Sequence, residues 1–122
     1  MEILILLLLL QIKHCYADFM IQTYAQTVRK GIYRDLVGIS HTMDHVTATL
    51  VALFLFSFWH TVPPLTILWI ALLEGIAHYH IDWFKVRYGC KDLTNSAFWA
   101  EFGLDQLSHQ LCYILIIAYL LF

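Results

Sequence analysis

The chain has few charged residues and little proline or glycine. Of its 122 residues, 13% are charged, two are proline and five are glycine. Soluble domains carry about 25% charged residues, and disordered chains need more charge, proline and glycine than are present. These shortages exclude an ordinary soluble enzyme domain, a disordered chain and a basic nucleic-acid-binding arm, so no nucleic-acid partner is expected.

Signatures of several common kinds of site are also missing. The three cysteines, Cys15, Cys90 and Cys112, form no C-x-x-C pair, so neither a disulfide framework nor a thiolate metal site is expected. The chain contains no P-loop, no dinucleotide-binding fingerprint and no G-x-S-x-G nucleophile motif. Any chemistry must therefore come from other side chains.

Apolar sequence is what the chain has in abundance. Hydrophobic residues make up 61% of it, too many for so small a protein to bury in its own interior. Four apolar segments each reach the about 20 residues that a helix needs to cross the hydrocarbon layer. We expect helices over about residues 2–28, 35–60, 65–88 and 97–122, separated by polar breaks. The predicted fold is all-α, an integral membrane four-helix bundle in which residues 1–122 form a single transmembrane domain within the lipid bilayer.

The basic residues predict the orientation of this bundle. Six of the seven lysines and arginines lie in or beside the first and third loops, namely Arg29, Lys30, Arg34, Lys85, Arg87 and Lys91. The positive-inside rule places these loops in the cytoplasm. The sequence therefore predicts a multi-pass protein of the inner (cytoplasmic) membrane, with up-down-up-down topology and with the N and C termini on the outer side.

Each expected helix carries polar residues four apart, which places them on one helix face. The four polar stripes are His14, Asp18 and Gln22; His41 and His45, with Asp44 beside them; Glu74, His78 and Asp82; and Glu101, Asp105 and His109. They lie late in the first and third helices and early in the second and fourth. An up-down bundle brings such positions to one depth, so we expect one polar site in the cytoplasmic half of the bilayer.

A metal centre is the favoured interpretation of this site. An unpaired carboxylate in a bilayer costs several kcal/mol, and a bound cation removes that cost. Imidazole and carboxylate without thiolate suit a divalent transition metal such as zinc, manganese or iron. The expected ligands are His14, Asp18, His41, His45, His78, Asp82, Asp105 and His109. Two divalent ions would balance the four negative charges of three aspartates and one bound hydroxide. The sequence leaves open whether one or two ions bind.

The remaining polar residues are given supporting roles. Glu74, Glu101 and Asp44 are candidate catalytic general bases. Gln22, Lys85 and Gln106 are expected to orient the ligands, with binding of an anionic substrate or snorkelling to the interface as other roles for Lys85. Two metal-free interpretations stay open, a proton or ion relay and a set of interhelical hydrogen bonds.

A membrane-embedded metal-dependent hydrolase is the first functional hypothesis. Metal ions lower the pKa of bound water and polarise a phosphoryl oxygen, so the expected substrate is a phosphorylated lipid or a nucleotide-type anion from the cytosol. The alternative is an ion or metal transporter or a proton channel, for which the chain would form a homo-oligomer to make a pore. A di-iron centre is disfavoured because Glu-x-x-His pairs are missing.

Three segments together resemble the signatures of one small family. They are His14-Cys15-Tyr16-Ala17-Asp18-Phe19-Met20-Ile21-Gln22, His78-Tyr79-His80-Ile81-Asp82-Trp83-Phe84-Lys85 and Asp105-Gln106-Leu107-Ser108-His109. The family is DUF3307, and the resemblance covers essentially the whole chain. The resemblance implies a bacterial or phage membrane protein. The residues of this chain that match the motif positions of the family are His14, Asp18, Gln22, His78, Asp82, Lys85, Asp105, Gln106 and His109. The resemblance implies no activity, and for a phage chain a further alternative is a non-enzymatic effector that binds a host membrane protein.

Overall fold

The computed structural model describes residues 1–122, and all of its regular elements are helices. In chain order they are α1 (Glu2–Cys15), the π-helical η1 (Tyr16–Ile21), α2 (Tyr24–Arg29), α3 (Leu36–Phe56), α4 (Pro64–Tyr88) and α5 (Ser96–Leu121). Four helices are long and apolar enough to cross a membrane, namely α1 continued by η1, α3, α4 and α5. The predicted all-helical fold with four possible membrane spans is confirmed.

The first predicted helix is interrupted in the structure. The regular α-helix widens into η1, and the chain then becomes extended at Gln22, with φ −60° and ψ 124°. Thr23 starts the separate helix α2 through a capping box, because its hydroxyl accepts from Gln26 N while Gln26 Oε1 accepts from Thr23 N. The expected single helix over residues 2–28 is therefore two helices joined by a π-helical segment and a break.

Side-chain caps and a proline set the other helix starts. Asp35 begins α3 by accepting hydrogen bonds from Val37 N and Gly38 N. A hydrogen bond from Arg29, together with these caps, holds the pKa of Asp35 below its usual value. Pro64 starts α4 as a first-turn proline, and Asn95 caps α5. Helix α3 ends at Phe56, before the expected residue 60, and the boundaries of α4 and α5 lie within one residue of those expected.

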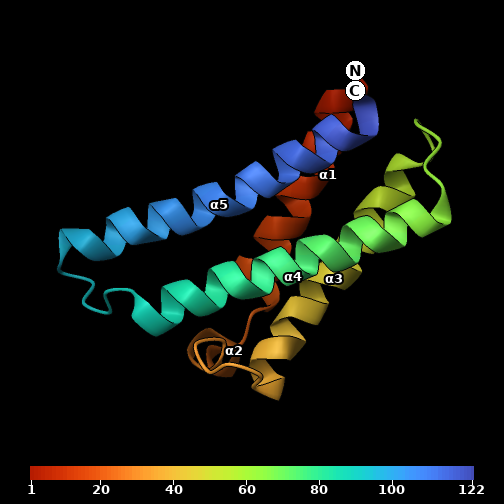
Figure 1. The fold of residues 1–122 in the computed structure, drawn as a ribbon. Coiled ribbons are helices and arrows are strands. Elements are labelled where there is room, and N and C mark those ends of the chain that lie inside the picture. Colours follow the sequence, from red (N-terminus) through yellow and green to blue (C-terminus); the bar gives the residue numbers. More distant parts are fainter.

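The long helices pack in neighbouring pairs. Helix α3 contacts both α4 and α1, and α5 contacts both α4 and α1. The two chain ends lie together at one end of the molecule, and the loop between α4 and α5 lies at the other (Figure 1). A Cβ atom at Gly75 of α4 would collide with Val46 of α3, so this glycine allows the two helices to approach closely.

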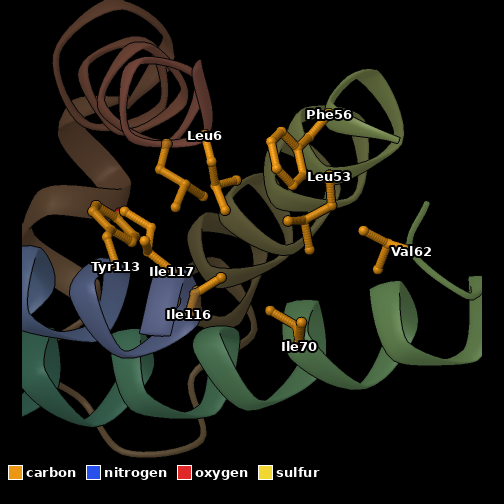
Figure 2. Close-up of a cluster of buried hydrophobic side chains, with 9 residues drawn as sticks. Leu6, Leu53, Phe56, Val62, Ile70, Tyr113, Ile116 and Ile117 are labelled. Atoms are coloured by element: carbon orange, nitrogen blue, oxygen red, sulfur yellow. The ribbon is translucent and has the colours of Figure 1, made fainter. Parts of the chain in front are cut away.

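The apolar core lies toward the chain ends. It is formed by Leu6, Leu10, Leu53, Phe56, Val62, Ile70, Tyr113, Ile116 and Ile117, from α1, α3, α4, α5 and the α3–α4 loop (Figure 2). Many other large apolar side chains point outward, and Phe84 and Leu104 are each 62% exposed. Outward apolar side chains are expected where lipid is the solvent. The other half of the interior is polar.

Candidate metal centre

Four helices bring five buried histidines together in the polar half of the interior. The rings of His45 and His78 stack with centroids 3.6 Å apart, and His78 lies 4.2 Å from His109. His14 and His41 complete the set, and each of the five is at most 3% exposed. Asp18, Asp82 and Asp105 lie among these rings. All eight residues expected as ligands from the sequence are therefore in one cluster.

One part of the cluster is the Asp18 group, made of Asp18, His41, His45 and His78. One ligand atom from each member lies within 4.8 Å of the others. Asp18 Oδ1 lies 3.1 Å from His41 Nε2 and 3.0 Å from His45 Nε2. The contact between His45 and Asp18 has hydrogen-bond geometry. The polar atoms of the Asp18 group therefore largely satisfy one another.

A second part is the Asp82 group, made of His78, Asp82 and His109, whose ligand atoms also lie within 4.8 Å of one another. His78 Nε2 is 3.2 Å from Asp82 Oδ2, and His109 Nε2 is 3.5 Å from Asp82 Oδ1. Asp105 Oδ1 lies 3.6 Å from His109 Nε2. Tetrahedral bonds of about 2.0–2.1 Å place ligand atoms about 3.3–3.4 Å apart, so these separations suit ligands around one ion.

Several atoms in and beside the Asp82 group are buried without a hydrogen-bond partner. They are His78 Nδ1, Asp82 Oδ2, Asp105 Oδ1 and His109 Nε2. Lys30 Nζ lies 3.0 Å from Asp82 Oδ2, an ion-pair contact that lacks hydrogen-bond geometry. A buried polar atom without a partner costs about 1–3 kcal/mol, and more when charged. The Asp82 group therefore contains buried ligand atoms that no hydrogen bond uses, although Lys30 compensates part of the charge of Asp82.

Two lysines that sequence reasoning did not place in the site lie within the cluster. Lys13 Nζ donates to Glu74 Oε1 at 2.8 Å, and Lys30 pairs with Asp82. Lys13 is 5% exposed. It is also the one basic residue outside the predicted cytoplasmic loops, inside an apolar segment. An intramembrane lysine is by itself a sign of function, and this signal could have identified it.

These lysines change the charge count of the cluster. The sequence-based count used three aspartates alone. The structure adds the carboxylate of Glu74 and the ammonium groups of Lys13 and Lys30. With neutral histidines, four carboxylates and two ammonium groups leave two negative charges. One divalent ion neutralises this charge.

His14 lies in the cluster but in neither of the two groups. Its Nδ1 is 2.8 Å from Tyr113 Oη, and its Nε2 is 3.0 Å from Gln106 Oε1 and 3.2 Å from Asp18 Oδ2. Both ring nitrogens therefore have protein partners, and the ring is placed to orient Asp18. Tyr113 is a further member of the site that sequence reasoning missed.

The other expected supporting residues divide into two kinds. Gln22 Nε2 lies 2.8 Å from His41 Nε2, and Gln106 contacts both His14 and Asp105. Lys85 contacts none of the clustered histidines, and its Nζ lies 5.0 Å from the centre of the Phe102 ring. The two glutamines are thus beside the cluster, whereas Lys85 is outside it.

The three carboxylates expected to act as general bases lie in different surroundings. Glu74 is in the cluster, but its oxygens are taken by Lys13 at 2.8 Å and by Thr49 at 3.0 Å. Glu101 accepts the backbone N–H of Cys90 in the α4–α5 loop at 2.6 Å. Asp44 accepts from Gln26 at 2.9 Å. Neither Glu101 nor Asp44 contacts the clustered histidines.

A cavity of about 680 Å³ lies between α4 and α5 beside the Asp82 group. This volume is typical of a small-molecule site. Asp105 belongs both to the cavity wall and to the histidine cluster, while Lys85 and Glu101 line the wall farther from the cluster. Asp105 therefore connects the cavity to the Asp82 group, whose own members do not line the cavity wall.

The segment that carries Asp18 has its own irregularity. Residues Tyr16–Ile21 form η1, and its wide turns present Asp18 to His41 and His45 of α3. Short π-helical segments occur often at functional sites. The local geometry thus agrees with the position of Asp18 at the centre of the cluster.

These features define a class, a helical protein with four possible membrane spans around a buried histidine and aspartate cluster. The family model described as "Protein of unknown function (DUF3307)" matches residues 3–122. The chain belongs to the DUF3307 family, as its motifs predicted. No curated protein and no solved structure matches the chain. The family description names no activity, so a function must be argued from the site.

Proposed function

We propose that this DUF3307 protein is an inner-membrane metal-dependent hydrolase that binds one divalent transition metal at the Asp82 group. Two unpartnered buried atoms, Asp82 Oδ2 and His109 Nε2, carry this proposal, together with His78 Nε2, which lies 3.2 Å from Asp82 Oδ2. Three protein ligands with one remaining position are typical of catalytic zinc sites. Imidazole and carboxylate ligands suit zinc, manganese or iron.

The charge of the cluster supports a single ion. Its carboxylates and lysines leave two negative charges, and a divalent ion brings this buried centre to neutrality. Neutrality matters because an uncompensated charge is expensive in a medium of low dielectric constant. Lys30 already compensates part of the charge on Asp82, which leaves less need for a second ion.

Hydrolysis requires a proton acceptor next to the attacking water. A bound metal ion lowers the pKa of a coordinated water and polarises a phosphoryl oxygen. Asp105 is the carboxylate that reaches both the cavity and the Asp82 group, and its Oδ1 is unpartnered. We assign Asp105 the role of accepting the proton of the water as its oxygen attacks phosphorus. The substrate is a phosphorylated lipid or nucleotide-type molecule. As the water oxygen bonds to phosphorus, the P–O ester bond breaks and the leaving oxygen takes up a proton, so the products are phosphate and the protonated leaving group.

The site faces the cytoplasm in this proposal. The two chain ends lie together (Figure 1), which agrees with both termini being on the same side of the membrane; we place them on the outer side. The basic loops around residues 30–35 and 89–95 are then cytoplasmic by the positive-inside rule. The Asp82 group lies in the half of the bundle nearer to these loops.

Elemental analysis of the detergent-purified chain tests the metal. We expect close to one equivalent of zinc, manganese or iron, lost in Asp82→Asn and in His109→Ala. His60→Ala is the matched control, because His60 lies away from the cluster and contacts Glu2. A chain that folds without stoichiometric metal would overturn the proposal.

Phosphate release from phosphorylated lipids and nucleotides tests the reaction. Asp105→Asn should keep the metal and lose at least about 100-fold in rate, as typical for a general base. Metal flux into liposomes without any phosphate release would instead support the transporter alternative.

A further inference from the structure

The cavity between α4 and α5 has a basic side chain in its wall and an apolar rim. We propose that it binds an amphiphile with a phosphate head group and a hydrocarbon chain. The head group lies between Lys85 and the Asp82 group, and the chain leaves past Phe84 and Leu104 into the bilayer. This inference rests on the proposed function and selects a lipid over a nucleotide as the substrate.

Lys85 is the charged group of the wall that is available to a ligand. Its ammonium forms no ion pair and lies 5.0 Å and 6.0 Å from the ring centres of Phe102 and Phe98. The other two charged residues of the wall are carboxylates that would repel an anion. Glu101 accepts the Cys90 N–H, and Asp105 accepts from Gln106 with Oδ2 only. An ammonium without an anionic partner beside a cavity is suited to a phosphate.

Two of the neutral polar residues of the wall, Ser108 and His80, make hydrogen bonds within the protein. Ser108 Oγ donates to Leu104 O at 2.8 Å, and His80 Nδ1 lies 2.8 Å from Ile76 O. The Tyr88 hydroxyl and the Trp83 indole N–H are neutral groups of the wall that remain for a ligand. The surface that the cavity exposes is otherwise mainly apolar. A mainly apolar surface favours a hydrocarbon chain over the base and sugar of a nucleotide.

The rim of the cavity suits a chain that extends into the membrane. Phe84 and Leu104 are each 62% exposed and belong to helices long and apolar enough to span a bilayer. Apolar side chains exposed at such a position face lipid. A chain bound between them would stay in contact with the bilayer while its head group reaches the polar centre.

Because the cavity wall contains two carboxylates, tight binding of an anionic ligand requires a bound metal ion. Glu101 and Asp105 together outweigh the single charge of Lys85. An anion is attracted only when a divalent ion at the Asp82 group offsets them. The protein is therefore tested as purified with its metal, and metal content is measured on the same sample.

Trp83 provides the readout, because it lines the cavity. A bromoalkyl phosphate should quench Trp83 fluorescence saturably, and Trp83→Phe should remove this component. The bromoalkyl trimethylammonium of the same chain length controls for partitioning into detergent. Lys85→Gln should weaken phosphate binding by about tenfold or more, as expected for a hydrogen bond to a charged group. Lys91→Gln, an exposed loop lysine, should leave it unchanged, and Lys85→Arg should retain most of it.

The outcomes separate this inference from the proposed function. Equal quenching by the cationic probe, or no effect of Lys85→Gln in a folded, metal-containing sample, would overturn the lipid site and leave the metal centre intact. Displacement by inorganic phosphate or ATP as effective as by the alkyl phosphate would show a head-group or nucleotide site instead. Saturable, Lys85-dependent binding in a chain that contains no metal would overturn both the proposed function and the metal requirement of this site.

Discussion

At the scale of single residues, the most unusual feature is a lysine and a glutamate paired in the interior. The side chains of Lys13 and Glu74 are 4% and 2% exposed, and Thr49 donates to the second oxygen of Glu74. Lys13 Nζ also lies 4.7 Å from the centre of the Tyr113 ring. Removing one member of a buried pair is costly because the other charge stays buried without compensation.

Lys13→Met should therefore destabilise the protein by about 3–5 kcal/mol. The measurement is unfolding in detergent followed by circular dichroism. The double variant Lys13→Met/Glu74→Met should recover most of the loss, because it removes both charges. A double variant as unstable as the single one would show that the ion pair is not the cause.

Lys30 allows a test of the charge count. Lys30→Met removes a positive charge 3.0 Å from Asp82 Oδ2 and leaves the cluster more negative. Because charges about 4 Å apart interact by about 4 kcal/mol at an effective dielectric constant of 20, we expect metal affinity to rise by about tenfold or more. Competition with a chelator measures this affinity, and Lys91→Met is the control. A lower affinity would mean that Lys30 supports the bound state.

At the scale of the elements, the contact between α3 and α4 depends on a missing side chain. The position of Gly75 against Val46 leaves no room for a larger residue. Both helices carry members of the Asp82 or Asp18 group, so their separation also sets the spacing of the ligands.

Gly75→Leu should cost about 1–3 kcal/mol through overpacking and should also reduce the metal content. Gly103→Ala in α5 is the matched control, because nothing lies within 4 Å of a Cβ atom there. Thermal unfolding and elemental analysis report the two effects. A Gly75→Leu protein with unchanged stability and metal would show that the two helices can separate freely.

Local patterns predicted the elements better than the contacts among them. The spans followed from apolar length, and the convergence of the polar stripes followed from the spacing of four. The break at Gln22 was missed because residues 24–28 continue the apolar segment, although Thr23 and Gln26 carry a helix-start signal. The contact of Lys30 with the site could not be predicted. Basic residues in this loop indicate the cytoplasmic side of the membrane, and nothing in the sequence shows that the long side chain of Lys30 reaches Asp82.

At the scale of the whole molecule, the proposed orientation places the α4–α5 loop inside and the α3–α4 loop outside. A variant without the free cysteines Cys15, Cys90 and Cys112 provides the background for labelling. In right-side-out vesicles, a membrane-impermeant maleimide should label Thr61→Cys and leave Asp92→Cys unlabelled until the vesicles are opened. The reverse pattern would place the metal centre in the outer half of the bilayer.

The buried lysines have a consequence for how the protein is made. In the proposed orientation, Glu74 and Asp82 enter the bilayer with α4, whether or not an ion is bound. Lys13 and Lys30 supply internal counter-charges to Glu74 and Asp82 at that stage. Under the proposed function, these counter-charges allow the helices to assemble before a metal ion binds.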